Sequence, residues 1–214
     1  MNIAVSRIAA LCGHHDFKSA RDAKKELVRR NSKCKYFKNQ KLLDVKTDLF
    51  NSSMYLWYCR SANVTGRMRI IARCLIDKIC KKHKMLYNKP YSYFCKERGL
   101  YREVHNTDEA EKLLDSKIYN RQRKINKKYS EFIICGSIDG ETDSHVIEIK
   151  TRSSPIDKFP LWEKIQLSWY AFILQKPGIL FAFHNGSFKK LDISLEQATK
   201  TAQETVEILK SIIQ

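Results

Sequence analysis

The chain is poor in acidic residues and lacks long apolar runs. Its 214 residues include 23 acidic residues against 40 basic ones, so the formal net charge is +17. No apolar run approaches the ~18 residues that suggest a membrane span. Residues 1–13 also lack the layout of a signal peptide. A soluble, intracellular protein with no membrane partner is therefore expected.

Ordered cysteine motifs are missing as well. The seven cysteines are scattered, odd in number and never spaced as C-x-x-C. This pattern favours neither a zinc site nor a disulfide framework, so reduced and mostly structural thiols are expected. What the chain does contain is 43% hydrophobic and 11% aromatic residues, which excludes a disordered chain and suits a single domain over 1–214.

The excess of positive charge indicates a polyanionic partner, most often nucleic acid. The alternative is a generally basic proteome with no such partner. Six basic residues and no acid lie within 117–128. Binding through such residues should weaken steeply with salt. The basic candidates for phosphate contact are Arg7, Arg69, Arg73, Arg121, Arg123, Lys124 and Arg152.

The spacing of apolar residues predicts an α/β fold with helices flanking a central mixed sheet. Residues 1–95 are expected to be mainly helical, basic and DNA-binding, and 96–214 to form the core. Residues 31–62 are interpreted as loop plus short helix. Strands are expected at 131–139 and 145–152 as an antiparallel pair, and at 179–184 and 188–193 as a hairpin through Asn185-Gly186. Helices are expected at 6–11, 19–30, 63–84, 96–114, 160–175 and from Ser194 onward.

One acid and an acid–lysine pair stand at the ends of two apolar runs. Asp139 ends the first run, and Glu148 and Lys150 stand two apart on the second. Residues two apart in a strand share a face, so this pair should lie side by side while Ile147 and Ile149 are buried. A hairpin would bring Asp139 alongside. Two carboxylates can hold a hard divalent cation and the ammonium can polarise a water, which is the minimum for metal-assisted phosphodiester hydrolysis.

Each of these residues also has an ordinary structural explanation. Asp139 precedes Gly140 and could be a turn residue, and Glu148 with Lys150 could be a surface ion pair worth little. The pKa of Lys150 could be lowered by burial or raised by the carboxylates, and the sequence leaves both open.

The same residues resemble the PD-(D/E)xK nuclease signature. Ile138-Asp139 followed by Glu148-Ile149-Lys150 has that order, with isoleucine in place of proline. Upstream, Gly99-Leu100-Tyr101-Arg102-Glu103 resembles the helical G-x-x-x-E element of the lambda-exonuclease-like branch, the viral recombinase nucleases.

Three further segments resemble this branch. Ser137-Ile138-Asp139-Gly140 is similar to its S-P-D-G strand end, and Gln166 to its glutamine in the helix after the lysine strand. Residues 3–8 are similar to its I-T-A-S element, in which a serine contacts phosphate; here that residue is Ser6. Residues 14–95 show no alignable resemblance.

The resemblance implies a restriction-endonuclease-like core with a magnesium site in which Mn²⁺ can substitute. The implied metal ligands are Asp139, Glu148, the Ile149 carbonyl and Glu103. Asp139, Glu148, Lys150 and Gln166 would be catalytic, with Lys150 orienting and helping to deprotonate the attacking water. Ser6 and Ser137 would contact nucleic acid.

The implied activity is 5′→3′ exonucleolytic cleavage of double-stranded DNA in viral or phage-type recombination or repair, in the cytoplasm or a host nucleus. A homotrimer and a single-strand annealing protein as partner follow from the same resemblance. Relatives include endonucleases and RNA-degrading enzymes. A non-catalytic nucleic-acid-binding protein and a basic RNA-associated structural protein are the other classes left open.

Overall fold

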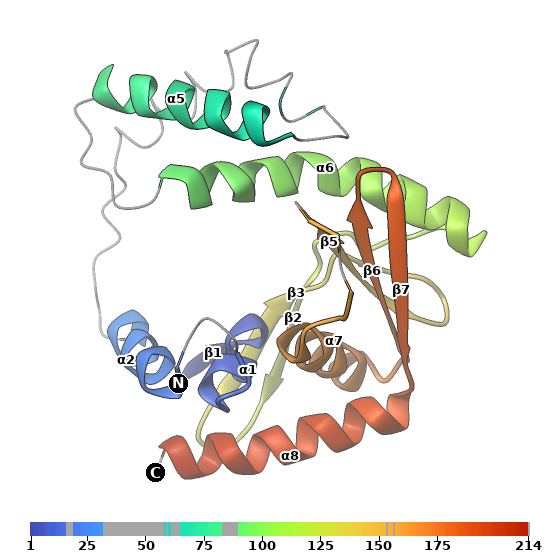
Figure 1. Ribbon diagram of the computed structural model, residues 1–214. Coiled ribbons are helices and arrows are strands. Elements are labelled where there is room, and N and C mark those ends of the chain that lie inside the picture. Colours follow the sequence, from blue (N-terminus) through green and yellow to red (C-terminus); the bar gives the residue numbers. More distant parts are fainter. Residues whose placement is uncertain are drawn as a thin grey trace.

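The computed structural model describes residues 1–15, 19–31, 58, 60, 65–82, 90–152, 154–155 and 157–213, without the side chains of 27–31, 76, 80 and 90–97. The expected loop and short helix at 31–62 lie almost wholly outside the described residues. The described helices are α1 (Val5–Leu11), α2 (Ala20–Asn31), α5 (Gly66–Lys82), α6 (Pro90–Leu114), α7 (Leu161–Leu174) and α8 (Leu195–Ile213) (Figure 1). The strands are β1 (Asn2–Ala4), β2 (Lys124–Lys128), β3 (Ile133–Ser137), β4 (Gly140–Glu141), β5 (Val146–Thr151), β6 (Gly178–His184) and β7 (Ser187–Ile193).

The strands form two mixed sheets. One has the order β1-β3-β2 and the other β4-β5-β6-β7. In the first, β1 is parallel and β2 antiparallel to β3. In the second, β5 and β6 are parallel, and β4 and β7 flank them in antiparallel orientation. The α/β class is therefore confirmed, with the strands divided between two sheets rather than gathered in one.

The predicted antiparallel pairing of 131–139 with 145–152 is wrong. β3 pairs with β1 and β2, whereas β5 pairs with β4 and β6. The chain leaves one sheet and enters the other at Ile138 and Asp139, and the short β4 takes the place next to β5. The predicted hairpin does form between β4 and β5, where Gly140 lies opposite Ile147 in an antiparallel pair. An apolar pattern predicts strands, but their partners depend on the rest of the chain.

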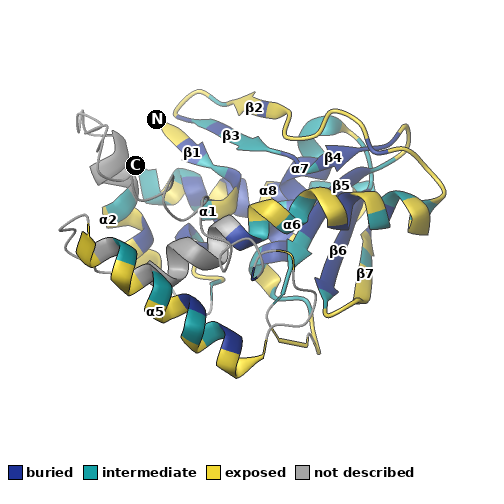
Figure 2. Cartoon of the chain, turned by 90° about the horizontal axis from the view of Figure 1, so that it is seen from above, coloured by how far each residue is buried: buried dark blue, intermediate teal, exposed yellow. Residues whose placement is uncertain are grey.

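The position of β6 explains its composition. Its seven residues are buried except for the last, while β7 is exposed along most of its length (Figure 2). A parallel pair covered on both faces requires a continuous apolar run such as that of Gly178–His184. The hairpin turn is the predicted Asn185-Gly186, whose φ angles of 48° and 80° suit the two left-handed positions of a tight turn.

Two hydrophobic clusters cover the two faces of the second sheet. The larger one packs α1, α7 and α8 around Trp169 and Leu180, both fully buried. The smaller one joins Ile147, Ile149 and Phe181 to Ala110 of α6. Ile147 and Ile149 therefore point toward α6, as predicted, and by alternation Glu148 and Lys150 point toward α7.

Local capping rules explain several helix ends. Ser194 Oγ accepts from Gln197 N, and Gln197 Oε1 accepts from Ser194 N, both at 3.1 Å, which is the capping box expected before α8. α7 starts directly after Pro160 and ends before Gln175, which is left-handed at φ 54°. α6 begins at Pro90 rather than at 96. In the described ranges no helix is both long and apolar enough to span a membrane.

Candidate active site

Asp139, Glu148 and Lys150 meet where the chain passes from one sheet to the other. Asp139 Oδ2 accepts a hydrogen bond of 2.7 Å from the Ile149 backbone N–H. This bond fixes the carboxylate beside the strand that carries the other two residues. Lys150 Nζ donates to Glu148 Oε1 on the α7 side of β5. The structure thus brings the three motif residues together.

The Glu148 carboxylate is the most deeply buried charge of the site, with an exposed fraction of 1%. Gln166 Nε2, from α7, donates to Glu148 Oε1 at 2.7 Å, the same oxygen that Lys150 contacts. The other oxygen, Oε2, is buried and has no hydrogen-bond partner among the described residues. Burial, with the Asp139 carboxylate second, raises the pKa of Glu148 to about 8. Burial of a carboxylate oxygen without a hydrogen bond disfavours the charged form of Glu148.

The structure shows in which direction the pKa of Lys150 is shifted. Burial lowers the pKa of the ammonium, but Glu148 and Asp139 together outweigh it, and the pKa of Lys150 is raised above its ordinary value. Lys150 is therefore an ammonium at neutral pH, a hydrogen-bond donor rather than a base. The surface ion-pair alternative does not hold, because Glu148 is buried.

Glu103, on α6, is linked to Asp139 by the side chain of Gln122, a residue that belongs to none of the sequence motifs. Gln122 Nε2 donates to Glu103 Oε1 and, at 3.4 Å, to Asp139 Oδ1. Burial, and next the Asp139 carboxylate, raises the pKa of Glu103. Gln122 has a left-handed backbone with φ 59° in the loop before β2. Its sequence neighbourhood is an ordinary basic loop, which offers no signal for this role.

The donor set fits a hard divalent cation. Asp139, Glu148 and Glu103 are all carboxylates, and the Asp139 charge raises the pKa values of both Glu103 and Glu148. Glu148 Oε2 is buried and has no hydrogen-bond partner among the described residues. Among the described residues, no group of three or more His, Cys, Asp or Glu side chains stands ready to hold a metal. The Gln122 amide and the Lys150 ammonium contact these carboxylates instead.

A cavity of about 500 Å³ adjoins the site beyond Gln166. The Tyr170 hydroxyl accepts from Gln166 Nε2 at 3.3 Å, which links the cavity wall to Glu148. Gly136 is required here, because a Cβ at this position would lie 2.8 Å from the Tyr170 ring. Tyr170 had no predicted role. Three residues predicted to contact nucleic acid line this cavity together: Ser6, Lys124 and Ser137.

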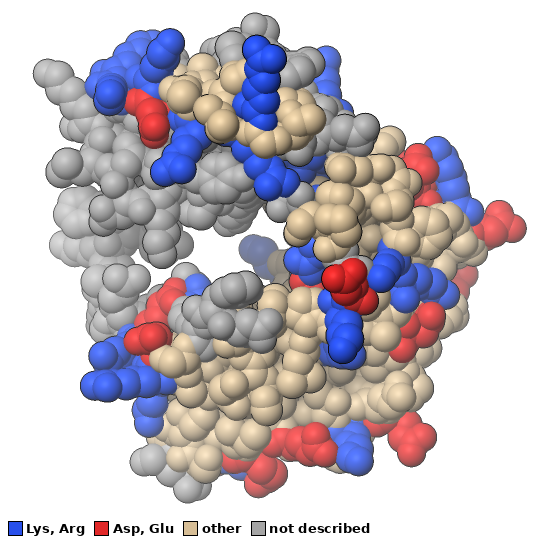
Figure 3. Space-filling model, in the orientation of Figure 1, with Lys and Arg blue, Asp and Glu red and all other residues tan. Residues whose placement is uncertain are grey.

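The predicted arginines mostly have acidic partners on the protein. Arg69 and Arg73 lie on α5, over which Figure 3 shows basic side chains, whereas acidic side chains gather along α8. The others form ion pairs, which neutralise part of their charge. These pairs are Arg7 with Glu26, Arg121 with Asp108 and Glu111, Arg123 with Glu141, and Arg152 with Glu163.

Comparison with known proteins places the fold. No protein-family model and no curated protein sequence matches the chain. The alkaline exonuclease LHK-Exo from Laribacter hongkongensis is similar in structure, with a TM-score of 0.55 at 12% identity over 99% of this chain and 87% of that chain. A protein of Eubacterium rectale that has been proposed to be an exonuclease gives a TM-score of 0.53 at 10% identity, over 99% and 79%. The chain therefore has the α/β fold of these structures, in agreement with the lambda-exonuclease-like resemblance.

Proposed function

We propose that this protein is a metal-dependent nuclease, and that it acts as a 5′→3′ exonuclease on double-stranded DNA. The observation that carries the proposal is the convergence of Asp139, Glu148 and Lys150, in which a second, buried oxygen of Glu148 has no hydrogen-bond partner among the described residues. The net charge of +17 and the likeness in fold to exonuclease structures support it. Both the substrate and the polarity rest on the family resemblance.

The carboxylates would hold the cation. Asp139 and Glu148, with the Ile149 carbonyl and Glu103, offer the oxygen ligands that Mg²⁺ prefers and Mn²⁺ accepts. When bound, the cation would supply a Lewis acid and stabilise the leaving 3′ oxygen. Glu148 must lose its proton to become a ligand, which its raised pKa opposes until positive charge is nearby.

Lys150 and Gln166 position the reacting groups. The Lys150 ammonium, held against Glu148, can orient the attacking water by hydrogen bonding and stabilise negative charge on the phosphate. Its raised pKa makes it less suited to take the water's proton itself. Gln166 holds Glu148 on one side and contacts Tyr170 on the other.

The serine-lined cavity would receive a phosphate of the substrate. Ser6 and Ser137 offer hydroxyl donors and Lys124 a positive charge, the usual partners of phosphate oxygens. Because Tyr170 and Gln166 separate this cavity from Glu148, a strand held there would present a neighbouring phosphodiester to the carboxylates. A role in viral or phage-type recombination or repair, as a trimer with a single-strand annealing protein, completes the proposal.

The test uses end-labelled linear duplexes and closed circular DNA incubated with Mg²⁺. Wild type should degrade linear duplexes from the 5′ end and spare circles, and Lys150→Ala should lose this activity about 10²- to 10³-fold, the cost of removing one preorganised donor. Lys200→Ala, an exposed lysine on α8, is the matched control and should cleave normally.

Each other outcome identifies an alternative. No metal-dependent cleavage of any DNA or RNA would leave the non-catalytic nucleic-acid-binding protein. Cleavage of circles would show an endonuclease, and preference for RNA an RNA-degrading enzyme. Light scattering of the purified protein tests the trimer.

A further inference from the structure

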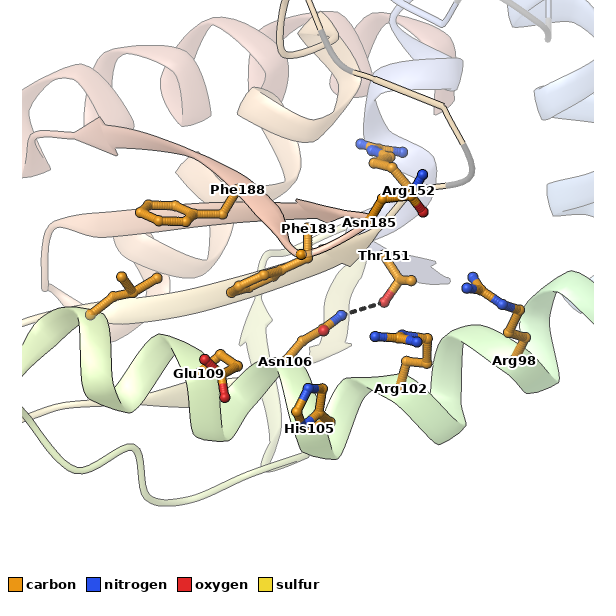
Figure 4. Close-up of a pocket in the computed structure, with 12 residues that line it drawn as sticks. Arg98, Arg102, His105, Asn106, Glu109, Thr151, Arg152, Phe183, Asn185 and Phe188 are labelled. Atoms are coloured by element: carbon orange, nitrogen blue, oxygen red, sulfur yellow. Dashed lines mark hydrogen bonds between the residues drawn. The ribbon is translucent and has the colours of Figure 1, made fainter. Parts of the chain in front are cut away.

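A second cavity, which we call the α6 pocket, lies on the opposite face of β5 from Glu148. It has a volume of about 370 Å³ and lies between α6 and the β6–β7 hairpin (Figure 4). Thr151, the residue after Lys150, reaches it from the end of β5. The side chains that carry the following argument are Arg98, Arg102, Asn106, Arg152, Phe183 and Phe188.

One end of the α6 pocket is positively charged. Arg98 and Arg102 lie one helical turn apart on α6, and Figure 4 shows both on the same side of the pocket as Arg152. Arg152 is paired with Glu163. The guanidinium groups of Arg98 and Arg102 line this end beside the Arg152–Glu163 pair, and guanidinium groups bind phosphate oxygens through forked hydrogen bonds.

The opposite end is aromatic and carries an acid. The Phe183 and Phe188 ring centroids lie 6.2 Å apart, and Phe188 is 46% exposed. An exposed ring at a pocket offers a face on which a planar base can stack. Glu109 lies at this end, away from the arginines, and its bond with Lys112 lowers the pKa of its carboxyl. The arginines therefore mark the end of the α6 pocket at which a phosphate would lie.

The middle of the α6 pocket is buried and polar. Asn106, with an exposed fraction of 3%, donates through Nδ2 to Thr151 Oγ1 at 2.8 Å. This bond ties α6 to the end of β5, one residue from Lys150.

We infer that the α6 pocket binds one nucleotide of a single-stranded nucleic acid, with its phosphate at Arg98 and Arg102 and its base on Phe188. A cavity of this volume lies at the lower end of the range of small-ligand sites and cannot admit a duplex. Bases in a duplex are stacked on one another, so only an unpaired base can offer its face to Phe188. The combination of arginines with an exposed ring therefore selects a single strand.

The inference deepens the proposed function and rests on it in one respect: the bound strand would be the one that enters or leaves the cleavage site. Arg102 directly precedes Glu103 on α6, and Thr151 directly follows Lys150 on β5. A nucleic-acid strand held in the α6 pocket would therefore contact the sequence neighbours of Glu103 and Lys150. Binding itself is measured in EDTA, so cleavage and binding can fail separately.

The experiment is fluorescence anisotropy of labelled oligo(dT) and of a labelled blunt duplex in EDTA. Phe188→Ala should weaken oligo(dT) binding about 5- to 100-fold, the range found for the loss of one stacked base, and leave duplex binding unchanged. Arg102→Gln should weaken oligo(dT) binding and reduce its salt dependence by about one phosphate contact. Tyr119→Ala, which removes a ring of similar exposure elsewhere, and Lys200→Gln are the controls and should bind like wild type.

Three results would overturn the inference. The first is oligo(dT) binding by Phe188→Ala and Arg102→Gln at wild-type affinity with unchanged melting temperatures. The second is an equal loss of affinity for oligo(dT) and for the duplex, which would show that the α6 pocket binds nucleic acid only through its general positive charge. The third is an equal loss in the controls. If wild type binds oligo(dT) through these residues but never cleaves with Mg²⁺, the proposed function fails and the inference stands.

Discussion

The two faces of strand β5 carry opposite kinds of side chain, apolar toward α6 and charged toward α7. On the α6 face, Ile147 and Ile149 are closed into a dry cluster. On the α7 face, Glu148 is 1% exposed and pairs with Lys150, whose side chain is 24% exposed. One Glu148 carboxylate oxygen has no hydrogen-bond partner among the described residues. Burying a charge costs free energy that the pair only partly recovers. The apolar face stabilises the fold, whereas the charged face lowers stability and is explained by the proposed catalytic function.

This comparison is sharpest at Glu148. We expect Glu148→Gln to reduce cleavage by about 10³-fold or more, because bound metal contributes several kcal/mol to the reaction. Folding should survive, since glutamine keeps the shape and can still bond Gln166. The measurements are the initial cleavage rate and the melting temperature with and without Mg²⁺. Mg²⁺ should raise the melting temperature of wild type and of the exposed control Glu204→Gln but not of Glu148→Gln. A full Mg²⁺ response in Glu148→Gln would remove this residue from the metal site.

On the α6 face of β5, a substitution is expected to reduce stability rather than cleavage. Ile147→Ala should lower the free energy of unfolding by about 2–5 kcal/mol, because Ile147 is fully buried and its removal leaves a cavity. Leu161→Ala, at an exposed position, should change it little. Urea denaturation measures both. A loss in Ile147→Ala no larger than in Leu161→Ala would show that this face is not core.

The pH dependence of stability tests the charged face without any cleavage. The pKa of Glu148 in the folded protein, about 8, lies above its ordinary value of 4.5, so the folded state favours the protonated form. Its stabilising contribution is complete below pH 4.5 and is lost as pH rises through about 8. Metal-free wild type should therefore lose stability over this window, and Glu148→Gln should lose less. Parallel stability curves for the two proteins in EDTA would contradict this.

The smallest predicted effect concerns Gln122, which links Glu103 to Asp139. Gln122→Ala should raise the Mg²⁺ concentration for half-maximal cleavage about tenfold, since residues that orient ligands typically contribute 10- to 100-fold. The maximal rate at saturating Mg²⁺ should change less. Gln203→Ala, an exposed glutamine on α8, is the control. An unchanged Mg²⁺ requirement would show that Gln122 does not help to orient the metal ligands.

Local rules explain why parts of the fold could be predicted. The capping box at Ser194, the turn at Asn185-Gly186 and the helix after Pro160 each depend on a few neighbouring residues, and each occurs as expected. The pairing of 131–139 with 145–152 failed because partners are selected across the whole chain. The two strands lie in different sheets, and β6, far along the sequence, is the parallel neighbour of β5.

The candidate site divides in the same way. The side-by-side placement of Glu148 and Lys150 follows from their spacing, whereas the contact of Gln122 with Glu103 spans 19 residues and leaves no sequence pattern. Arg98 and Asn106 were likewise not anticipated, because only the packing of α6 against β5 gives them a pocket to line.

By itself, the sequence determined which residues share a face: the two-residue period of a strand is set by backbone geometry, so Glu148 and Lys150 must emerge together. It also determined the positive charge of the chain. Only the tertiary structure decided that burial raises the pKa of Glu148 and that nearby carboxylates raise the pKa of Lys150. It alone also decided that α6 encloses a second, basic and aromatic pocket behind them. Electrostatic energies depend on distances and burial between distant segments, and those exist only once the chain has folded.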